Sequence, residues 1–180
     1  MLRIIGGKYR HLKIEAPDVD TTRPTTDRVR EGLMSALSTY IPNKNVLDLF
    51  AGSGALGLES LSRGAKSATF VDANINAINT IKLNIKNIKI EEDTIVYFGK
   101  YKDFLNQNKD KKYGVVFLDP PYKMKECYDE IVNFLFENDM LEEDAIIVKE
   151  CDIDFGDDDR FVKRKSYKYG IIHLNVYWRK

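Results

Sequence analysis

The fold is decided by one stretch of the chain, VLDLFAGSGALGLE, residues Val46–Glu59. Its apolar start is typical of a short buried strand and its end of a helix. Between them, Gly52, Gly54 and Gly57 match the pattern G-x-G-x-x-G, whose glycines let the backbone approach a ligand at a helix N-terminus. The next strand, SATFVD, ends at Asp72, twenty residues after Gly52. This context predicts an adenosine-containing cofactor at the carboxyl ends of the strands, with Asp72 accepting hydrogen bonds from ribose hydroxyls.

The acid Asp48 separates the two classes of cofactor that this template accepts. A dinucleotide places its pyrophosphate at this turn, and an anionic side chain just before the loop would repel it. S-adenosylmethionine has no phosphate, and its sulfonium and ammonium groups are cationic, so a carboxylate attracts it. The sequence therefore favours S-adenosylmethionine over a dinucleotide. A glycine-rich turn that serves only packing is the remaining alternative.

Around this stretch the chain alternates short apolar strands with amphipathic helices, which predicts a mainly parallel sheet covered on both faces. We expect strands at residues 45–51, 67–72, 94–98, 114–119 and 145–150, and helices at 26–40, 55–64, 74–87, 101–106 and 126–137. Two strand-like segments on either side of Gly170, residues 160–169 and 171–180, predict a C-terminal β-hairpin. Residues 2–5 and 11–14 predict an N-terminal β-hairpin. No linker or repeat divides the chain, so we expect one domain over 1–180, with a hairpin and loop extension (1–25) and a core (26–180).

A second informative stretch is VVFLDPPYKM, residues Val115–Met124, in which a strand stops at an acid and two prolines. Pro120 and Pro121 have no N–H, so beside Asp119 this backbone offers acceptors without donors. The complementary group is an exocyclic amine with two N–H bonds. Tyr122 offers a flat surface on which an extruded base can stack, which is worth about 1–3 kcal/mol. The stretch predicts methyl transfer to a nucleobase amine, with Asp119 accepting a proton or stabilising the developing charge; a plain D-P-P turn is the alternative.

The composition is that of an ordinary soluble globular protein, with 43% hydrophobic and 31% charged residues among 180. No apolar run reaches the roughly 18 residues needed to span a membrane, and the N-terminus lacks the apolar segment of a signal peptide. Cys127 and Cys151 form neither a disulfide framework nor a metal-ligand cluster. We therefore expect a reduced, cytoplasmic protein without a metal site and without a membrane partner.

A formal net charge of zero hides an uneven distribution of charge along the chain. Residues 126–159 carry fourteen acids against the single base Lys149, whereas residues 160–180 carry seven bases and no acid. Such a chain could present a basic face to a phosphate backbone, and we expect the C-terminal bases to contribute salt-dependent RNA binding. Charges scattered over solvated surfaces are the alternative.

Four motifs occur in a characteristic order: RIIGGKYRHLKI (residues 3–14), RPTTDRVREGL (23–33), LDLFAGSGALGLESLSRGA (47–65) and FLDPPY (117–122). Over nearly the whole chain they resemble the RsmD family of bacterial 16S rRNA guanine-N2 methyltransferases. The first two motifs are the most specific, because many amino-methyltransferases share the others. The resemblance implies an α/β, Rossmann-like class I methyltransferase fold, with a seven-stranded, mostly parallel sheet whose last strand is antiparallel. It also implies S-adenosyl-L-methionine as cofactor, S-adenosyl-L-homocysteine as product, and a guanine of 16S rRNA in a partly assembled small subunit as substrate.

Roles for individual residues are carried over by matching positions. The cofactor candidates are Asp48, Ala51, Gly52, Ser53, Gly54, Asp72 and Ala73, together with Arg23 and Thr25 of the second motif, for which a helix cap and a surface arginine are the alternatives. The catalytic candidates, which would hold the guanine amine, are Asp119, Pro120, Pro121 and Tyr122. The candidate phosphate contacts are Lys8, Arg10, His11, Arg28 and Arg30. The chain departs from the family after its third core strand, where FGKYKDF (Phe98–Phe104) replaces a polar residue near the adenine, and there we expect Tyr101 to be a packed helix-start aromatic.

Three other functions remain as alternatives. An adenine-N6 methyltransferase would use the same amine chemistry, but sequence-specific DNA enzymes need an added recognition domain for which this chain has no room. A non-catalytic RNA-binding protein of the same fold is disfavoured by intact Asp48, Asp72 and Asp119. A nicotinamide dehydrogenase is disfavoured by Asp48, and His11 and His173 look structural or RNA-facing. A monomer is the expected state.

Overall fold

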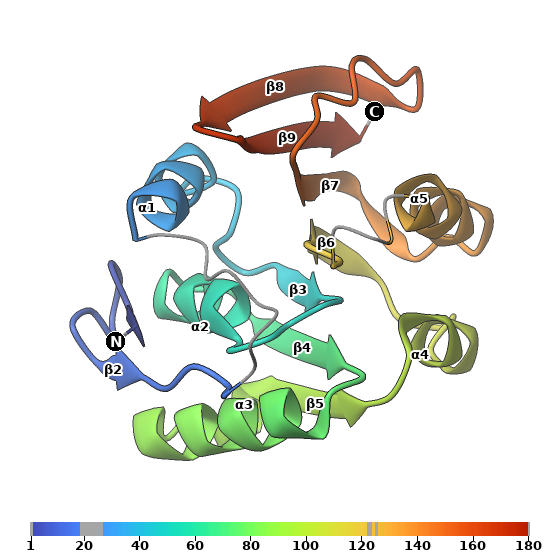
Figure 1. The fold of residues 1–180 in the computed structure, drawn as a ribbon. Helices are drawn as coiled ribbons and strands as arrows, with labels where there is room; N and C mark the ends of the chain where they lie inside the picture. Colours follow the sequence, from blue (N-terminus) through green and yellow to red (C-terminus); the bar gives the residue numbers. More distant parts are fainter. Residues whose placement is uncertain (1, 19–26, 122–123, 125, 180) are drawn as a thin grey trace.

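The computed structural model describes residues 2–18, 27–121, 124 and 126–179 (Figure 1). Within them the strands are β1 (Leu2–Arg3), β2 (Lys13–Ile14), β3 (Asn45–Asp48), β4 (Ser67–Asp72), β5 (Thr94–Phe98), β6 (Tyr113–Leu118), β7 (Leu141–Cys151), β8 (Phe161–Tyr169) and β9 (Ile172–Arg179). The helices are α1 (Asp27–Ala36), α2 (Ala55–Ser62), α3 (Ile75–Ile88), α4 (Tyr101–Gln107) and α5 (Cys127–Glu137), with a 3-10 turn at Glu91–Asp93.

The central sheet has seven strands in the order β5-β4-β3-β6-β7-β9-β8. The strands from β5 to β7 are parallel, while β9 is antiparallel to both β7 and β8. The strand order reverses between β3 and β6, and an open α/β sheet places its ligands outside the carboxyl ends at such a point. The topology therefore puts the site beyond Asp48 and Leu118, the last residues of these two strands.

Helices cover both faces of the sheet, as the short buried strands require. Helices α1, α2 and α3 lie on one face and α4 and α5 on the other (Figure 1). Two apolar cores fill the space between the layers. One joins Phe70 and Phe117 to residues of α1, α2 and α3, and the other joins Leu47 and Val116 to residues of α4 and α5.

The N-terminal hairpin lies outside the helix layer, against α2 (Figure 1). Its β1–β2 pairing is extended by bonds from the Ile4 N–H to the Leu12 carbonyl and from the His11 N–H to the Ile4 carbonyl, both 2.9 Å. Ile4 and Ile14 are only 1% and 2% exposed, and both belong to the core beneath α1 and α2. Their burial fixes the hairpin to the body of the molecule.

The predicted fold is confirmed, including the seven-stranded sheet, its antiparallel β9 and the N-terminal hairpin. Strands β4 and β5 begin and end where the sequence predicts, whereas β7 begins at Leu141, ahead of the predicted Ala145. Arg23, Thr25 and Tyr122 lie outside the described residues. No helix in the described part of the chain is long and apolar enough to cross a membrane.

Candidate active site

The glycine turn between β3 and α2 has the backbone that its sequence requires. Gly52 and Gly54 adopt φ values of 55° and 78°, the left-handed region that side chains other than glycine rarely occupy. Gly57 meets a different constraint, because a Cβ there would lie 2.3 Å from Cε1 of Phe70. The first two glycines therefore shape the turn, and the third lets α2 approach β4.

The carboxylate of Asp48 lies beneath the first turn of α2. Asp48 is 2% exposed and accepts a hydrogen bond from the Gly57 N–H at 3.3 Å. Burial raises the pKa of Asp48 to about 7, the Gly57 bond opposes that rise, and the negative charge of Asp72 adds to it. The cofactor-free site therefore contains a buried acid that becomes easier to ionise when a cation binds beside it.

Asp72 fastens the glycine turn to the next strand. Its carboxylate accepts hydrogen bonds from the Gly52 N–H at 2.9 Å and from the Asn74 N–H at 2.8 Å. The Ala51 N–H adds a 3.0 Å bond to the carbonyl of Val71. Asp72 is half-buried at the end of β4, so it stabilises the turn while its edge remains accessible to a ligand.

Asp119 follows β6 at the same end of the sheet as Asp48 and Asp72. Asp48 is in register with Phe70 on β4 and with Phe117 on β6, so Asp72 and Asp119 each lie two residues beyond that level on the same face. Neighbouring strands are about 4.8 Å apart, which places Asp72 and Asp119 about 10 Å apart on either side of β3. The two halves of the predicted site therefore meet at one edge of the sheet.

A fourth acid, Glu150, was not predicted as a site residue. Phe117 is in register with Val148, so Glu150 on β7 is level with Asp119 and shares its face. Glu150 is 7% exposed, and Asp119 is partly exposed with a buried Pro120 beside it. Burial raises the pKa of Asp119 well above its ordinary value. The negative charge of Glu150 and, to a smaller extent, that of Asp48 add to this rise. The sequence carried a signal for Glu150, because it lies near the end of a buried strand, as Asp48, Asp72 and Asp119 do.

Comparison with known proteins shows the family of the chain. The family model described as "Conserved hypothetical protein 95" matches residues 2–178. "Putative rRNA methyltransferase YlbH" of Bacillus subtilis (strain 168) is 35% identical over 184 residues, covering 98% of each chain. "Ribosomal RNA small subunit methyltransferase D" of Escherichia coli (strain K12) is 39% identical over 155 residues, or 86% of this chain and 77% of that one. The solved structure "Putative methyltransferase yhhF from Escherichia coli" has a TM-score of 0.87 at 33% identity, covering 99% of this chain and 98% of that one.

The chain belongs to the RsmD family. Its fold is that of the S-adenosylmethionine-dependent methyltransferases. The N-terminal hairpin carries the first of the four motifs on which the resemblance rests, and two side chains of α2 hold that hairpin. Glu59, 1% exposed, accepts the N–H bonds of Ile5 at 2.9 Å and Gly6 at 2.8 Å, and Ser62 Oγ accepts from the Tyr9 N–H at 2.9 Å. The hairpin thus docks on the helix that begins at the cofactor turn.

Asn84 of α3 connects the same N-terminal segment to the glycine turn. Its Oδ1 accepts from the Glu15 N–H at 2.8 Å, and its Nδ2 donates to the carbonyls of Glu15 and Ser53, both at 3.0 Å. Asn84 is 1% exposed, so these bonds are made away from solvent. Sequence reasoning missed Asn84, although a polar residue between Ile81 and Ile85 on the buried stripe of α3 was a signal.

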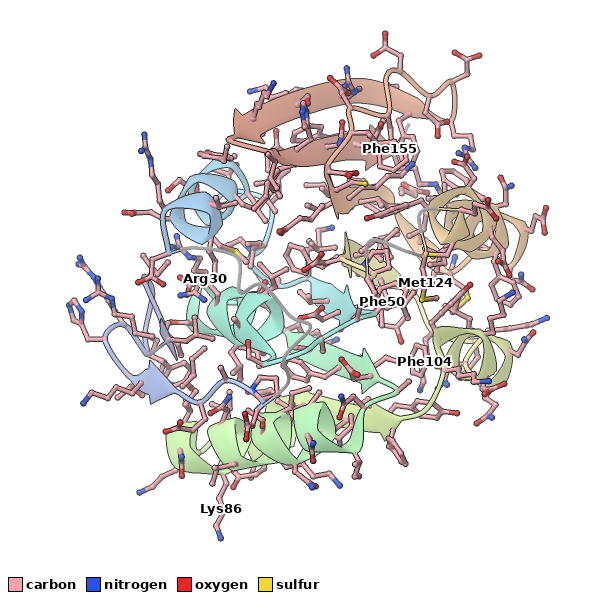
Figure 2. The ribbon with its side chains drawn as sticks, in the orientation of Figure 1. Arg30, Phe50, Lys86, Phe104, Met124 and Phe155 are labelled. Carbon is pink, nitrogen blue, oxygen red and sulfur yellow. The ribbon has the colours of Figure 1, made fainter. Side chains whose placement is uncertain are left out.

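The five predicted RNA contacts differ in exposure, and the structure corrects one of them. Lys8, Arg10, His11 and Arg28 are exposed. Arg30 is 1% exposed, and its Nη2 donates to the Arg3 carbonyl at 2.6 Å and to Asp27 Oδ1 at 2.9 Å (Figure 2). The prediction that Arg30 contacts phosphate is therefore wrong for this arrangement, because the guanidinium is used inside the protein.

The C-terminal bases are less available than the charge distribution predicts. Arg160 pairs with Asp158 and Asp129, and Arg164 pairs with Asp154 and, at 3.7 Å, with Asp157. Part of the acidic segment thus packs against the basic one that follows it, and these two arginines are paired with acids. Exposed lysines such as Lys165 remain on β8.

The segment after β5 contains two differently placed aromatic residues. Tyr101 begins α4, is 9% exposed and packs on Phe50 with ring centroids 5.4 Å apart, as expected for a packed helix-start aromatic. Phe98 is 57% exposed and is in register with Asp72. Phe98 rather than Tyr101 therefore offers a free apolar ring beside the predicted ribose ligand.

The raised pKa of Asp48 predicts how stability depends on pH. Asp48 holds its proton more tightly in the folded chain, with a pKa of about 7, than in an unfolded chain, where the pKa of an aspartate is ~4. The cofactor-free chain should therefore lose stability as the pH rises from ~4 to ~7. Asp48→Asn cannot ionise and should reduce the slope of this part of the thermal-denaturation profile, leaving the contribution of Asp119, whose pKa is also raised. A profile as steep as that of the wild type would contradict the assignment.

The bonds of Asn84 predict a selective effect on cofactor binding. Asn84→Asp keeps the shape but loses both donors and turns a carboxylate towards two carbonyls, and one unsatisfied buried group costs about 1–3 kcal/mol. We expect about tenfold weaker binding of S-adenosylhomocysteine by calorimetry, with circular dichroism showing a folded chain. Asn87→Asp, on the exposed face of the same helix, is the matched control and should bind as the wild type does. Equal affinities in both variants would show that Asn84 does not position the turn.

Proposed function

We propose that this protein transfers a methyl group from S-adenosylmethionine to the exocyclic N2 amine of a guanine in 16S rRNA, during assembly of the small ribosomal subunit. The observation that carries the proposal is the placement of Asp119 and Glu150 on neighbouring strands, beside the glycine turn and Asp48. Family membership and the names of the relatives support the coarser activity, methylation of small-subunit rRNA.

The cofactor is proposed to bind over the glycine turn, held by the candidates of β3, β4 and their loops. Asp48 would attract the ammonium and sulfonium groups, whose positive charge favours its ionised form. Asp72 would accept from the ribose hydroxyls, and the exposed ring of Phe98 would lie against the adenine. The remaining proposed contacts are Ala51, Gly52, Ser53, Gly54 and Ala73, with Arg23 and Thr25 outside the described residues.

The proposed chemistry begins with an amine that is a poor nucleophile, because its lone pair is delocalised into the purine ring. Asp119 and the carbonyl of Pro120 would accept its two hydrogens, so that the nitrogen becomes more tetrahedral and directs its lone pair at the methyl carbon. S-adenosylmethionine would supply the methyl group, with the N–C bond forming as the S–C bond breaks and the sulfur keeping the bonding pair. The proton leaves to Asp119, whose raised pKa makes it a stronger base than an exposed aspartate. Pro121 and Tyr122, the latter outside the described residues, would pack against the base.

Glu150 favours guanine over adenine. The Watson–Crick edge of guanine places an N1–H donor beside the N2 amine, whereas adenine has an acceptor at N1. A second carboxylate level with Asp119 can accept that N1–H, and would face a lone pair if adenine entered. Glu150→Gln replaces a charged acceptor by a neutral one, so we expect roughly tenfold lower kcat/KM on rRNA with unchanged cofactor affinity. Equal kcat/KM would remove Glu150 from base recognition.

Asp119→Ala is expected to abolish methylation while S-adenosylhomocysteine still binds with wild-type affinity. The carboxylate acts on the acceptor amine, so its removal leaves the cofactor contacts in place. Stopped methylation with intact calorimetric binding supports this role. Loss of cofactor binding would assign Asp119 to the cofactor instead.

The proposed function itself is tested by labelled methyl transfer to three acceptors in parallel. Unmodified small subunits, free 16S rRNA and DNA are incubated with the protein, and the products are digested to nucleosides. N2-methylguanosine in RNA is the expected product. N6-methyladenosine would establish the adenine alternative, and the absence of transfer to any of the three would favour a non-catalytic RNA-binding protein.

A further inference from the structure

A groove between the N-terminal hairpin and the start of α1 lies apart from the methyl-transfer residues. Its volume is about 340 Å³, and it is lined by Leu2, Arg3, His11, Lys13 and Asp27. Arg3, His11 and Lys13 are exposed. Two permanent cations, one histidine and one acid thus line an open depression on the surface.

Arg3 and Lys13 stand directly opposite each other in the hairpin. They are register partners in the antiparallel β1–β2 pair, in which facing side chains have Cβ atoms about 4.5–5.5 Å apart. Ile14 points into the core at 2% exposure, so its neighbour Lys13 points away from it, towards solvent. Like charges directly opposite each other destabilise a strand pair. An anion bound between them would remove that cost.

The one acid of the groove does not neutralise the pair. Asp27 lies 3.4 Å from Nε of Arg3, but it also accepts a 2.9 Å bond from the buried Arg30. Asp27 is therefore shared between Arg3 and Arg30, and its single negative charge cannot neutralise both of them and Lys13. Arg30 also donates to the Arg3 carbonyl at 2.6 Å, so it holds the backbone of β1 against α1. A buried arginine thus positions the groove from beneath.

We propose that this groove binds a backbone phosphate of the RNA whose base is methylated, with Arg3 and Lys13 as the contacting cations and Arg30 as a positioning residue. The inference rests on the proposed function, because it needs an RNA substrate. Its position supports it, since Lys13 is two residues from Glu15, which Asn84 connects to Ser53 of the glycine turn. The groove is therefore at the end of the hairpin nearer the cofactor.

The groove also connects the predicted RNA contacts at the hairpin turn, Lys8 and Arg10, to the proposed site of methyl transfer. The Lys8 N–H donates to the Ser62 carbonyl at 2.7 Å, at the C-terminal end of α2, about 12 Å along the helix axis from Gly54. Lys8 and Arg10 alone would hold RNA far from the reacting base. Arg3 and Lys13 extend the basic surface towards it, and an extended polyanion suits such a row better than a single small anion.

The test measures the salt dependence of binding to unmodified small subunits and to free 16S rRNA, for the wild type and the double variant Arg3→Gln/Lys13→Gln. Each lost phosphate contact should reduce the slope of log K against log salt by about 0.7–0.9. We expect a reduction of about 1 and roughly fivefold to tenfold weaker binding near ~100 mM salt, with cofactor affinity unchanged. Lys66→Gln/Lys86→Gln removes two exposed lysines elsewhere and should keep the wild-type slope; Lys86 projects into solvent from α3 (Figure 2).

The outcomes separate the groove from the proposed function. A double variant with the wild-type slope, in a wild type that methylates rRNA, would overturn the groove and leave the function standing. An equal loss in the Lys66/Lys86 control would also overturn it, because the effect would then follow net charge alone. A wild type that neither binds nor methylates either RNA substrate would overturn the proposed function and the groove together.

Discussion

The structure depends on burying the carboxyl group of Asp48 beneath the glycine turn. Asp48 is enclosed by β3 and the first turn of α2, and the single Gly57 bond does not compensate for its desolvation, so its pKa rises to about 7. The close approach of α2 to β4 at Gly57 makes this burial possible. In the proposed function, the cationic cofactor would supply the missing positive charge. The buried acid would then be a cost in stability of keeping a binding group ready for its ligand.

The N-terminal hairpin is part of the same unit. Glu59 and Ser62 hold its turn from α2, and Asn84 holds the segment after β2 from α3. These two helices flank the glycine turn, so the hairpin cannot shift without disturbing bonds that reach Ser53. The hairpin and the glycine turn, which are far apart in the sequence, are therefore joined by a few buried polar side chains.

The sequence predicts local features better than long-range partners. Asp48, Asp72 and Asp119 were found because each follows an apolar strand, and parallel topology then places such residues at one edge. Glu150 has the same signal and was passed over. The partners of Asn84 lie 69 and 31 residues away in the sequence, a distance at which helical periodicity carries no information. Arg30 was misjudged for a related reason: whether an arginine faces solvent or the protein interior depends on which segment folds back against it, here the backbone of Arg3.

In the proposed function, the distribution of charge around the candidate site would determine how an RNA enters it. Asp48, Asp119 and Glu150 would make the site acidic, so that a phosphate is repelled there while the N1–H and N2 amine donors of guanine are accepted. The cations lie outside, on the hairpin and at the groove by α1. A nucleotide can satisfy both regions only when its base is turned away from its own backbone, which is the geometry of an extruded base. A bound cofactor would bring positive charge to this site and weaken the repulsion, so the proposed function predicts that the RNA enters after the cofactor.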